Sequence, residues 1–158
     1  FNPSSPYGMS KVMAEDIIKQ YCREYTIFRF YNVGGRTPNN PEGLYAAVKN
    51  AEKSGVFTIF GNDYNTKDGT PVRDYVHVDD LTDAIVRAVN TPAAMTDYEP
   101  IGSGKSYTVK EYLDTYLEKY GDKFYYTYGD RRPGDLEISE VPFVSKFMDP
   151  RIELKDIV

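Results

Sequence analysis

The sequence predicts an α/β fold for this chain of 158 residues. Segments with the apolar spacing of helices alternate with short β-branched and aromatic segments typical of buried strands, and the connections between them are short. The hydrophobic share of 41% and the aromatic share of 15% suffice for one compact core. We therefore expect one globular unit of alternating helices and strands.

The first two elements are predicted to be a helix at 7–24 and a buried strand at 26–33. Pro6 stands where a first-turn proline is tolerated, and apolar residues such as Val12 and Ile17 recur at helical spacing. The strand, TIFRFYNV, is followed by two glycines. The remaining elements, bounded by glycines, prolines and an aspartate cap, follow in this order: loop 36–43, helix 44–55, strand 56–61, strand 72–78, a helix capped by Asp79 or Asp80 and ending at about 90, strand 97–102, helix 108–120, strand 123–129 and an irregular tail.

Composition excludes several classes of function. The net charge is −5 and the lysines and arginines are scattered, which disfavours a nucleic-acid partner or a membrane-binding face. A single cysteine and a single histidine are too few for a zinc site built from protein ligands alone. The single cysteine also cannot form a disulfide within the chain, which suits a reducing cytoplasm. With no apolar run of about 20 residues and no signal-peptide pattern, we expect a soluble protein. The chain opens on Phe1, shortly before a helix, so we also expect a cut inside a domain.

Two motifs are set aside. The segment GSGKS at 102–106 resembles the end of a phosphate-binding P-loop, but the required earlier glycine is replaced by Glu99. His77 lies within an apolar strand pattern, so we assign it a structural role.

Tyr7 and Lys11 lie four residues apart at the start of the first helix and so share a face. Nearby cations favour the phenolate form of a tyrosine, which can then take a proton from a hydroxyl. The spacing alone also fits a surface tyrosine beside a solvated lysine, and both interpretations stay open.

Five segments, in order, carry a resemblance: NPSSPYGMSKVMAE, FRFYNVGG, IFGNDYNTKDGTPVRDYVHVDDL, IGSGKSYTVKE and DRRPGDL. Together they resemble the extended short-chain dehydrogenase/reductase family, and within it the UDP-glucose 4-epimerase branch. The most specific segment is 59–81, because related sugar-nucleotide dehydratases typically lack its GNDYNTKDGT insertion.

The resemblance implies the C-terminal part of a Rossmann-like NAD-binding fold plus a small α/β substrate-binding domain. Residues 1–35 would be the last elements of the Rossmann-like domain, and 36–158 the sugar-nucleotide domain, with 72–91 packing back on the Rossmann part. A homodimer of the complete protein is implied by analogy alone.

The implied reaction is NAD-dependent epimerisation at C4 of a UDP-hexose, UDP-glucose or UDP-galactose, through a 4-keto intermediate. Tyr7 would take the hydroxyl proton while a hydride moves to NAD. Lys11 would hold the nicotinamide ribose, and Tyr31 would line the nicotinamide.

For the substrate, the resemblance implies that Arg73 and Arg132 hold the diphosphate and ribose, a role that suits the planar fork of arginine. Without the resemblance, Arg73 would be expected to pair with Asp74 or Asp79, and Arg132 to be a solvated loop charge. The other implied substrate residues are Asn32 at the diphosphate, Thr58, Ile59 and Phe60 at the uridine, and Asp135 and Ser139.

Ser139 lies four residues beyond Asp135, at an offset that in the family borders the substituent on the sugar's C2. A small residue there would leave space for an N-acetyl group. An exposed loop position is the alternative.

The chain departs from the family in several ways, two of which bear on catalysis. It has no glycine-rich turn after an early strand to cradle the cofactor pyrophosphate, and it lacks the catalytic serine that the family places ahead of its tyrosine. We therefore expect the chain alone to be inactive and to bind NAD negligibly. Two alternatives stay open: a sugar-nucleotide dehydratase or decarboxylase of the same superfamily, and a non-catalytic module that binds UDP-sugars.

Overall fold

The computed structural model describes residues 3, 5–35, 43–91 and 96–158. Helices alternate with strands, several of them paired in parallel, which confirms the predicted α/β class. The predicted loop at 36–43 lies outside the described residues except for its last position. The elements are α1 (Pro6–Tyr21), β1 (Thr26–Phe30), β2 (Asn32–Gly34), α2 (Gly43–Ser54), β3 (Val56–Phe60), β4 (Val72–His77), α3 (Val78–Val89), β5 (Thr96–Ile101), β6 (Ser106–Thr108), α4 (Val109–Tyr120), β7 (Tyr125–Gly129), β8 (Ile138–Ser139) and α5 (Leu154–Ile157).

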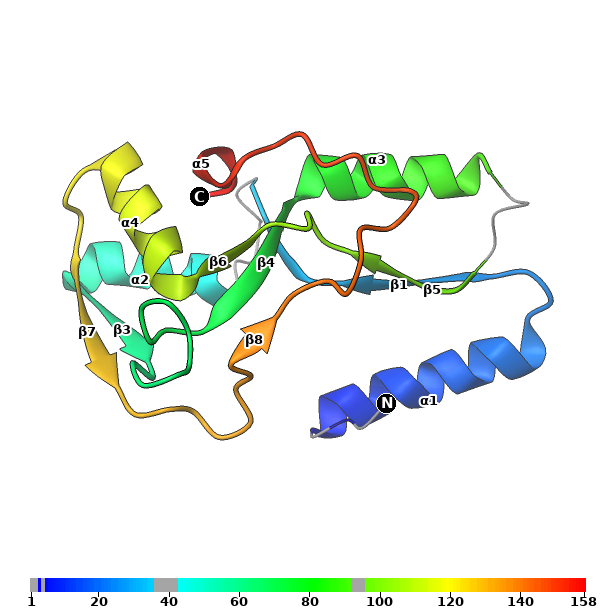
Figure 1. The fold of residues 1–158 in the computed structure, drawn as a ribbon, viewed down its shortest axis with the longest axis horizontal. Coiled ribbons are helices and arrows are strands. Elements are labelled where there is room, and N and C mark those ends of the chain that lie inside the picture. The colour runs from blue at the N-terminus through cyan, green and yellow to red at the C-terminus, as the bar shows by residue number, and fades with distance from the viewer. Residues whose placement is uncertain (1–2, 4, 36–42, 92–95) are drawn as a thin grey trace.

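One half of the molecule is built on the parallel pair of β1 and β5, with α1 on one side and α3 on the other (Figure 1). Leu81 and Ala84 of α3 share a hydrophobic core with Ile101 of β5. Helix α1 is joined to β1 by an ion pair, in which Glu15 Oε2 lies 2.5 Å from Arg29 Nη2. This half therefore forms a three-layer arrangement of helix, strands and helix.

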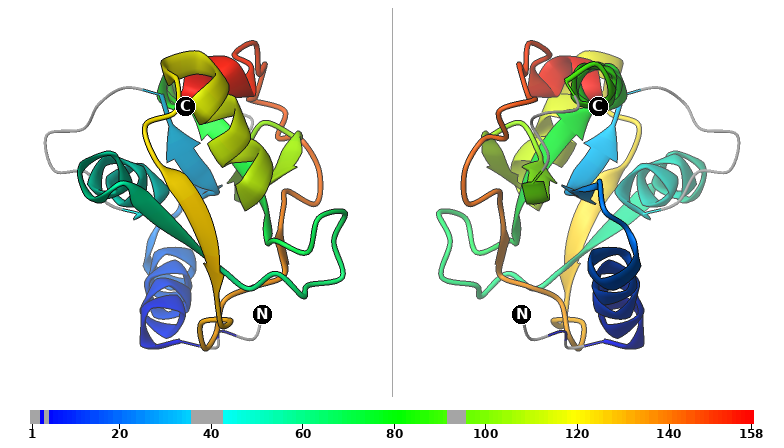
Figure 2. Two further views of the ribbon diagram at one scale, coloured as in Figure 1. Left: turned by 90° about the vertical axis from the view of Figure 1, so that its left-hand side faces the viewer. Right: turned by 90° about the vertical axis from the view of Figure 1, so that its right-hand side faces the viewer.

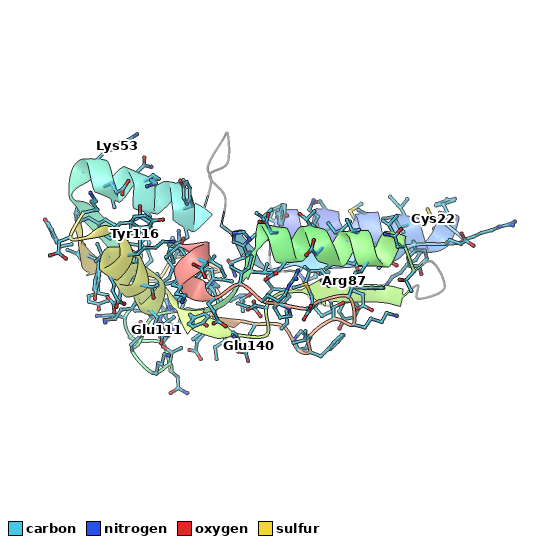
Figure 3. All side chains as sticks on the ribbon, turned by 90° about the horizontal axis from the view of Figure 1, so that it is seen from above. Cys22, Lys53, Arg87, Glu111, Tyr116 and Glu140 are labelled. Carbon is cyan, nitrogen blue, oxygen red and sulfur yellow. The ribbon has the colours of Figure 1, made fainter. Side chains whose placement is uncertain are left out.

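The other half is built on the parallel pair of β3 and β7, with α2 and α4 to either side of β7 in the left view of Figure 2. Phe57 of β3 and Leu113 of α4 belong to its core. Tyr116, labelled in Figure 3, lies where α4 meets α2. Its hydroxyl donates to Glu52 Oε1 at 2.8 Å and accepts from Lys49 Nζ at 2.8 Å, which ties the two helices together.

Strand β4 runs between the two halves and carries three partners. It pairs in parallel with β2 and β8 and antiparallel with β6. Because β4 contacts both cores, residues on it are held in a fixed relation to α3 and to α4.

The predicted single strand at 26–33 is wrong, because the chain divides there into β1 and β2, which pair with different strands. Tyr31 lies at the division, and its N–H donates to Ile101 O at 3.0 Å, at the end of β5. Before Tyr31 the segment pairs with β5, and after it the segment pairs with β4. The sequence analysis also missed β6, β8 and α5, which are short and depend on long-range partners.

Local signals fix the start of α1. Ser5 caps the helix by accepting from the N–H of Gly8 at 3.1 Å, and Pro6 occupies the first turn as predicted. The helix ends at Tyr21, three residues before the predicted end at 24. Within the described ranges, no helix combines the length and the apolar character needed to cross a membrane.

Candidate functional site

A cavity of about 630 Å³ lies between α2, β3 and β4 and is bordered by the loop that follows β7. It brings together seven of the eight predicted substrate residues: Asn32, Thr58, Ile59, Phe60, Arg73, Arg132 and Asp135. Of the described residues that the sequence analysis singled out, Tyr7, Lys11, Tyr31 and Ser139 do not line this cavity.

Two arginines reach the cavity from different elements and meet at one carboxylate. Arg73 Nη2 lies 2.6 Å from Asp135 Oδ1, and Arg132 Nη2 lies 3.0 Å from Asp135 Oδ2. Arg73 thus pairs with Asp135, and not with Asp74 or Asp79 as expected without the resemblance. Arg132 is exposed, as expected of a loop residue, but it also forms an ion pair with Asp135. Two guanidinium groups converging on a shared anion are suited to bind phosphate oxygens.

Strand β3 supplies an aromatic surface beside this charged group. Its side chains alternate, with Phe57 and Ile59 buried and Thr58 and Phe60 exposed. The guanidinium carbon of Arg132 lies 4.7 Å from the centroid of the Phe60 ring. An aromatic ring with an adjacent arginine provides a surface on which a planar base can stack.

Asn32 and Tyr31 lie next to each other but have different surroundings. Asn32 donates from Nδ2 to the carbonyl oxygen of Asp74 at 3.1 Å, which fixes its side chain at the cavity wall. Burial, together with the nearby Asp74 carboxylate, raises the pKa of the Tyr31 hydroxyl. Tyr31 therefore stays protonated at neutral pH and can act only as a neutral hydrogen-bonding group.

The Asp74 carboxylate is fully buried and organises the segment GSGKS. Its Oδ1 accepts from Ser103 N at 2.7 Å and from Ser103 Oγ at 3.0 Å, and its Oδ2 accepts from Gly104 N at 2.8 Å. Backbone N–H groups that a P-loop would offer to a phosphate are here bonded to an internal carboxylate. The geometry agrees with setting the P-loop interpretation aside.

His77 has the structural role predicted for it. Its Nδ1 accepts from the N–H of Asp79 at 3.1 Å and so caps the start of α3. Gly35 lies against the imidazole with φ +108, and a Cβ added there would lie 2.1 Å from the ring. The contact needs glycine both for its positive φ and for the close approach.

Tyr7 and Lys11 share one face of α1, as their spacing predicts. Lys11 Nζ lies 5.0 Å from the centroid of the Tyr7 ring, and Tyr7 is 72% exposed. In Figure 1 the N-terminal end of α1 points toward the half that contains α2 and β3. The pair therefore offers an accessible phenol beside a cation, apart from the cavity lining.

Ser139 lies in β8, where its Cα partner in the ladder is Arg73. It is thus next to the cavity arginine in the backbone, although it does not line the cavity.

The sequence analysis missed several lining residues, notably Asn50 of α2 and Tyr75 of β4. Tyr75 could have been found, because it follows Arg73 by two positions and alternate residues of a strand share a face. Asn50 carried no comparable signal.

The chain resembles known proteins along most of its length. Residues 1–104 match the family model described as NAD dependent epimerase/dehydratase family. A UDP-glucose 4-epimerase of Lactobacillus helveticus is 39% identical over 150 residues, covering 85% of this chain and 46% of the relative. The chain spans about half the length of the curated relatives it matches.

Solved structures give the same picture. The UDP-glucose 4-epimerase from Bifidobacterium longum in complex with NAD+ and UDP superposes with a TM-score of 0.83 at 25% identity, covering 99% of this chain and 53% of that one. An NAD-dependent NDP-hexosamine 5,6-dehydratase of tunicamycin biosynthesis gives a TM-score of 0.74 at 25% identity, covering 89% of this chain and 45% of that one. The resemblance seen in the motifs is therefore confirmed, and the chain belongs to the NAD dependent epimerase/dehydratase family.

Proposed function

We propose that the protein containing this chain catalyses NAD-dependent epimerisation at C4 of a UDP-hexose, interconverting UDP-glucose and UDP-galactose through a 4-keto sugar. The observation that carries the proposal is the cavity in which Arg73 and Arg132 converge beside Phe60. Guanidinium groups suit a diphosphate, and the aromatic ring suits uracil. The curated relatives named as UDP-glucose 4-epimerases support the same substrate class.

The substrate residues have distinct tasks in this proposal. Arg73 and Arg132 bind the diphosphate, and Asp135 positions both guanidinium groups. Thr58, Ile59 and Phe60 form the uridine wall, Asn32 binds near the diphosphate, and Ser139 borders the sugar. Holding the nucleotide end firmly leaves the hexose free to present either face of C4 to the catalytic groups.

Tyr7 and Lys11 fit a nicotinamide cofactor, because an accessible phenol and an ammonium lie side by side on α1. NAD, when bound, supplies the hydride acceptor and donor for the sugar C4. Tyr7 takes and returns the proton of the C4 hydroxyl, and Lys11 binds the nicotinamide ribose. Tyr31, kept protonated by its surroundings, borders the nicotinamide.

A homodimer of the complete protein and a cytoplasmic location belong to the same proposal. Met9, Met13 and Ile17 are exposed at successive turns of α1, with exposures of 49%, 59% and 57%. An apolar stripe of this kind suits a helix-to-helix contact. The single cysteine, Cys22, suits a reducing compartment, and it is exposed directly after the C-terminal end of α1 (Figure 3).

The test is a turnover assay of the full-length protein with UDP-glucose and NAD, in which UDP-galactose is separated and quantified. We expect interconversion to reach equilibrium from either hexose. UDP binding without turnover of either sugar would favour the non-catalytic module instead.

A dehydratase is the second candidate, favoured by the similarity to the NDP-hexosamine 5,6-dehydratase. Dehydration eliminates water and lowers the product mass by that of water, whereas epimerisation leaves the mass unchanged. Mass spectrometry of the same reaction mixtures therefore separates the two. The 59–81 segment, with its insertion before Arg73, supports the epimerase.

A further inference from the structure

One polar side chain of the cavity has no task in the function proposed above. Asn50 lines the cavity from the middle of α2 and is exposed. Within the described parts of the chain, its carboxamide has no hydrogen-bond partner. Asparagine is a weak helix former, because its side chain competes for backbone hydrogen bonds. Asn50 therefore lowers the stability of α2 without a contact that offsets the loss, and its place in the lining points to a ligand.

The neighbours of Asn50 on α2 leave its side chain room. Ala47 lies three positions before it and Ser54 four positions after it, so the three residues share one stripe of the helix, and all three line the cavity. The side chains of alanine and serine are short. Of the two polar residues that α2 contributes to the lining, Asn50 and Ser54, it is Asn50 that has the longer reach.

The position of Asn50 along the cavity separates it from the arginines. Gly55 alone joins α2 to β3, so both elements lead away from the same point. The rise of a helix places Asn50 about 8 Å from this point, and the rise of a strand places Thr58 at about 10 Å and Phe60 at about 17 Å. Arg132 lies against the Phe60 ring, at the far end of β3. Asn50 is therefore level with the uridine wall at Thr58 and short of the place assigned to the diphosphate.

The chemistry of a carboxamide matches the edge of a pyrimidine base. Its oxygen accepts hydrogen bonds and its NH2 group donates them. Uracil presents the N3–H donor next to the O4 acceptor on one edge, so a single carboxamide can pair with both groups. A diphosphate offers acceptors alone and would leave the carboxamide oxygen without a donor.

We propose that Asn50 reads the base of the bound nucleotide, with Nδ2 donating to O4 of uracil and Oδ1 accepting from N3–H. This inference rests on the proposed function, because it takes UDP as the ligand of the cavity. The Phe60 ring offers a stacking surface that suits any base, since every base has a π-face. Asn50 adds selectivity, because a base without a donor at N3 leaves the carboxamide oxygen unpaired.

The experiment compares Asn50→Ala with Lys53→Ala in the full-length protein. Lys53 is exposed on the same helix and does not line the cavity (Figure 3). UDP, UDP methylated at N3 of the base, and inorganic pyrophosphate are titrated calorimetrically. Methylation removes the N3–H donor, and pyrophosphate lacks the base. We expect Asn50→Ala to raise the Kd for UDP about 5- to 20-fold, the scale of one or two neutral hydrogen bonds, and Lys53→Ala to leave it unchanged.

The loss should be confined to the edge of the base. Wild type should bind the methylated nucleotide more weakly than UDP, and Asn50→Ala should remove most of this difference, while pyrophosphate binds equally to both proteins. Equal losses for UDP and its methylated form, or weaker pyrophosphate binding by Asn50→Ala, would overturn the proposal. Failure of wild type to bind UDP would overturn the proposed function along with it, whereas equal UDP binding by wild type and Asn50→Ala would overturn the role of Asn50 alone.

Discussion

Arg73 and Asp135 are 62 positions apart in the chain, yet Nη2 of the arginine lies 2.6 Å from Oδ1 of the aspartate. Both side chains are largely shielded, at 14% and 18% exposure. The carboxylate also holds Arg132, so one internal anion faces two cations at the place assigned to the diphosphate. An external anion must therefore compete with Asp135 for the same N–H groups.

Asp135→Asn should distinguish two effects of the Asp135 carboxylate: it stabilises the folded protein, and it competes with external anions for the two guanidinium groups. Loss of the charged partner should lower the free energy of unfolding by about 1–3 kcal/mol, measured by urea denaturation. Inorganic pyrophosphate should bind more tightly, because the guanidinium groups no longer share their charge with an internal anion. Calorimetric titration with pyrophosphate measures this gain.

The matched control for Asp135→Asn is Asp63→Asn. Asp63 accepts from Arg131 Nε at 2.7 Å in an exposed ion pair, and neither residue lines the cavity. This change should leave pyrophosphate affinity unaltered. If Asp135→Asn gave the same pyrophosphate affinity as wild type, competition by the carboxylate would be excluded.

Arg73→Ala and Arg132→Ala should each weaken UDP binding, because each removes a charge-assisted hydrogen bond worth about 1.5–3 kcal/mol. The loss should be larger for Arg73, since its side chain is far less exposed than that of Arg132. Arg131→Ala provides the control from outside the cavity. UDP affinities that did not change in either cavity variant would leave both arginines with a purely structural role.

Tyr7→Phe should lower kcat for UDP-hexose epimerisation at least about 100-fold in the full-length protein, the scale of general acid–base catalysis. Tyr21→Phe is a suitable control, since Tyr21 lies on the same helix and is 74% exposed, close to the 72% of Tyr7. Steady-state assays should show a loss in the first variant alone. A decrease below threefold for Tyr7→Phe would remove this phenol from the mechanism.

The sequence was most informative where structure is local. The start of α1 depends on Ser5 and Pro6, both adjacent to it, and the pairing of Tyr7 with Lys11 follows from helical spacing. The segment 26–33 was misjudged because its division at Tyr31 depends on two partner strands far along the chain. Periodicity within eight residues carries no record of those partners.

In the candidate site, too, the sequence indicated the types of residue involved, whereas their arrangement depends on contacts between distant segments. The residue types of Arg73 and Arg132 suggested anion binding, but their convergence on Asp135 depends on the tertiary fold. Only the family resemblance connected these positions before the structure was known. Among the described residues the buried hydroxyl of Tyr75 has no hydrogen-bond partner, and the sequence could not show this, because it depends on which groups the fold places around that hydroxyl.

The ion pair between Glu15 and Arg29 should make the attachment of α1 sensitive to acid. The hydrogen bond from Arg29 lowers the pKa of the Glu15 carboxyl, against a smaller opposing effect of burial. A carboxyl with a lowered pKa in the folded state contributes stability that is fully present above the unfolded value, near pH 4, and is lost as the pH falls through the folded value. Glu15→Gln should therefore destabilise the protein at pH 7 and have progressively less effect below about pH 4.

Urea denaturation of wild type and Glu15→Gln at several pH values measures this difference directly. Asp16→Asn is the control on the same helix, since Asp16 is exposed. The two side chains of the pair are 13% and 26% exposed, so we expect a difference at pH 7 of about 1–3 kcal/mol. A difference between wild type and Glu15→Gln that stayed constant from pH 7 to pH 3 would show that the charge of Glu15 does not hold α1 against β1.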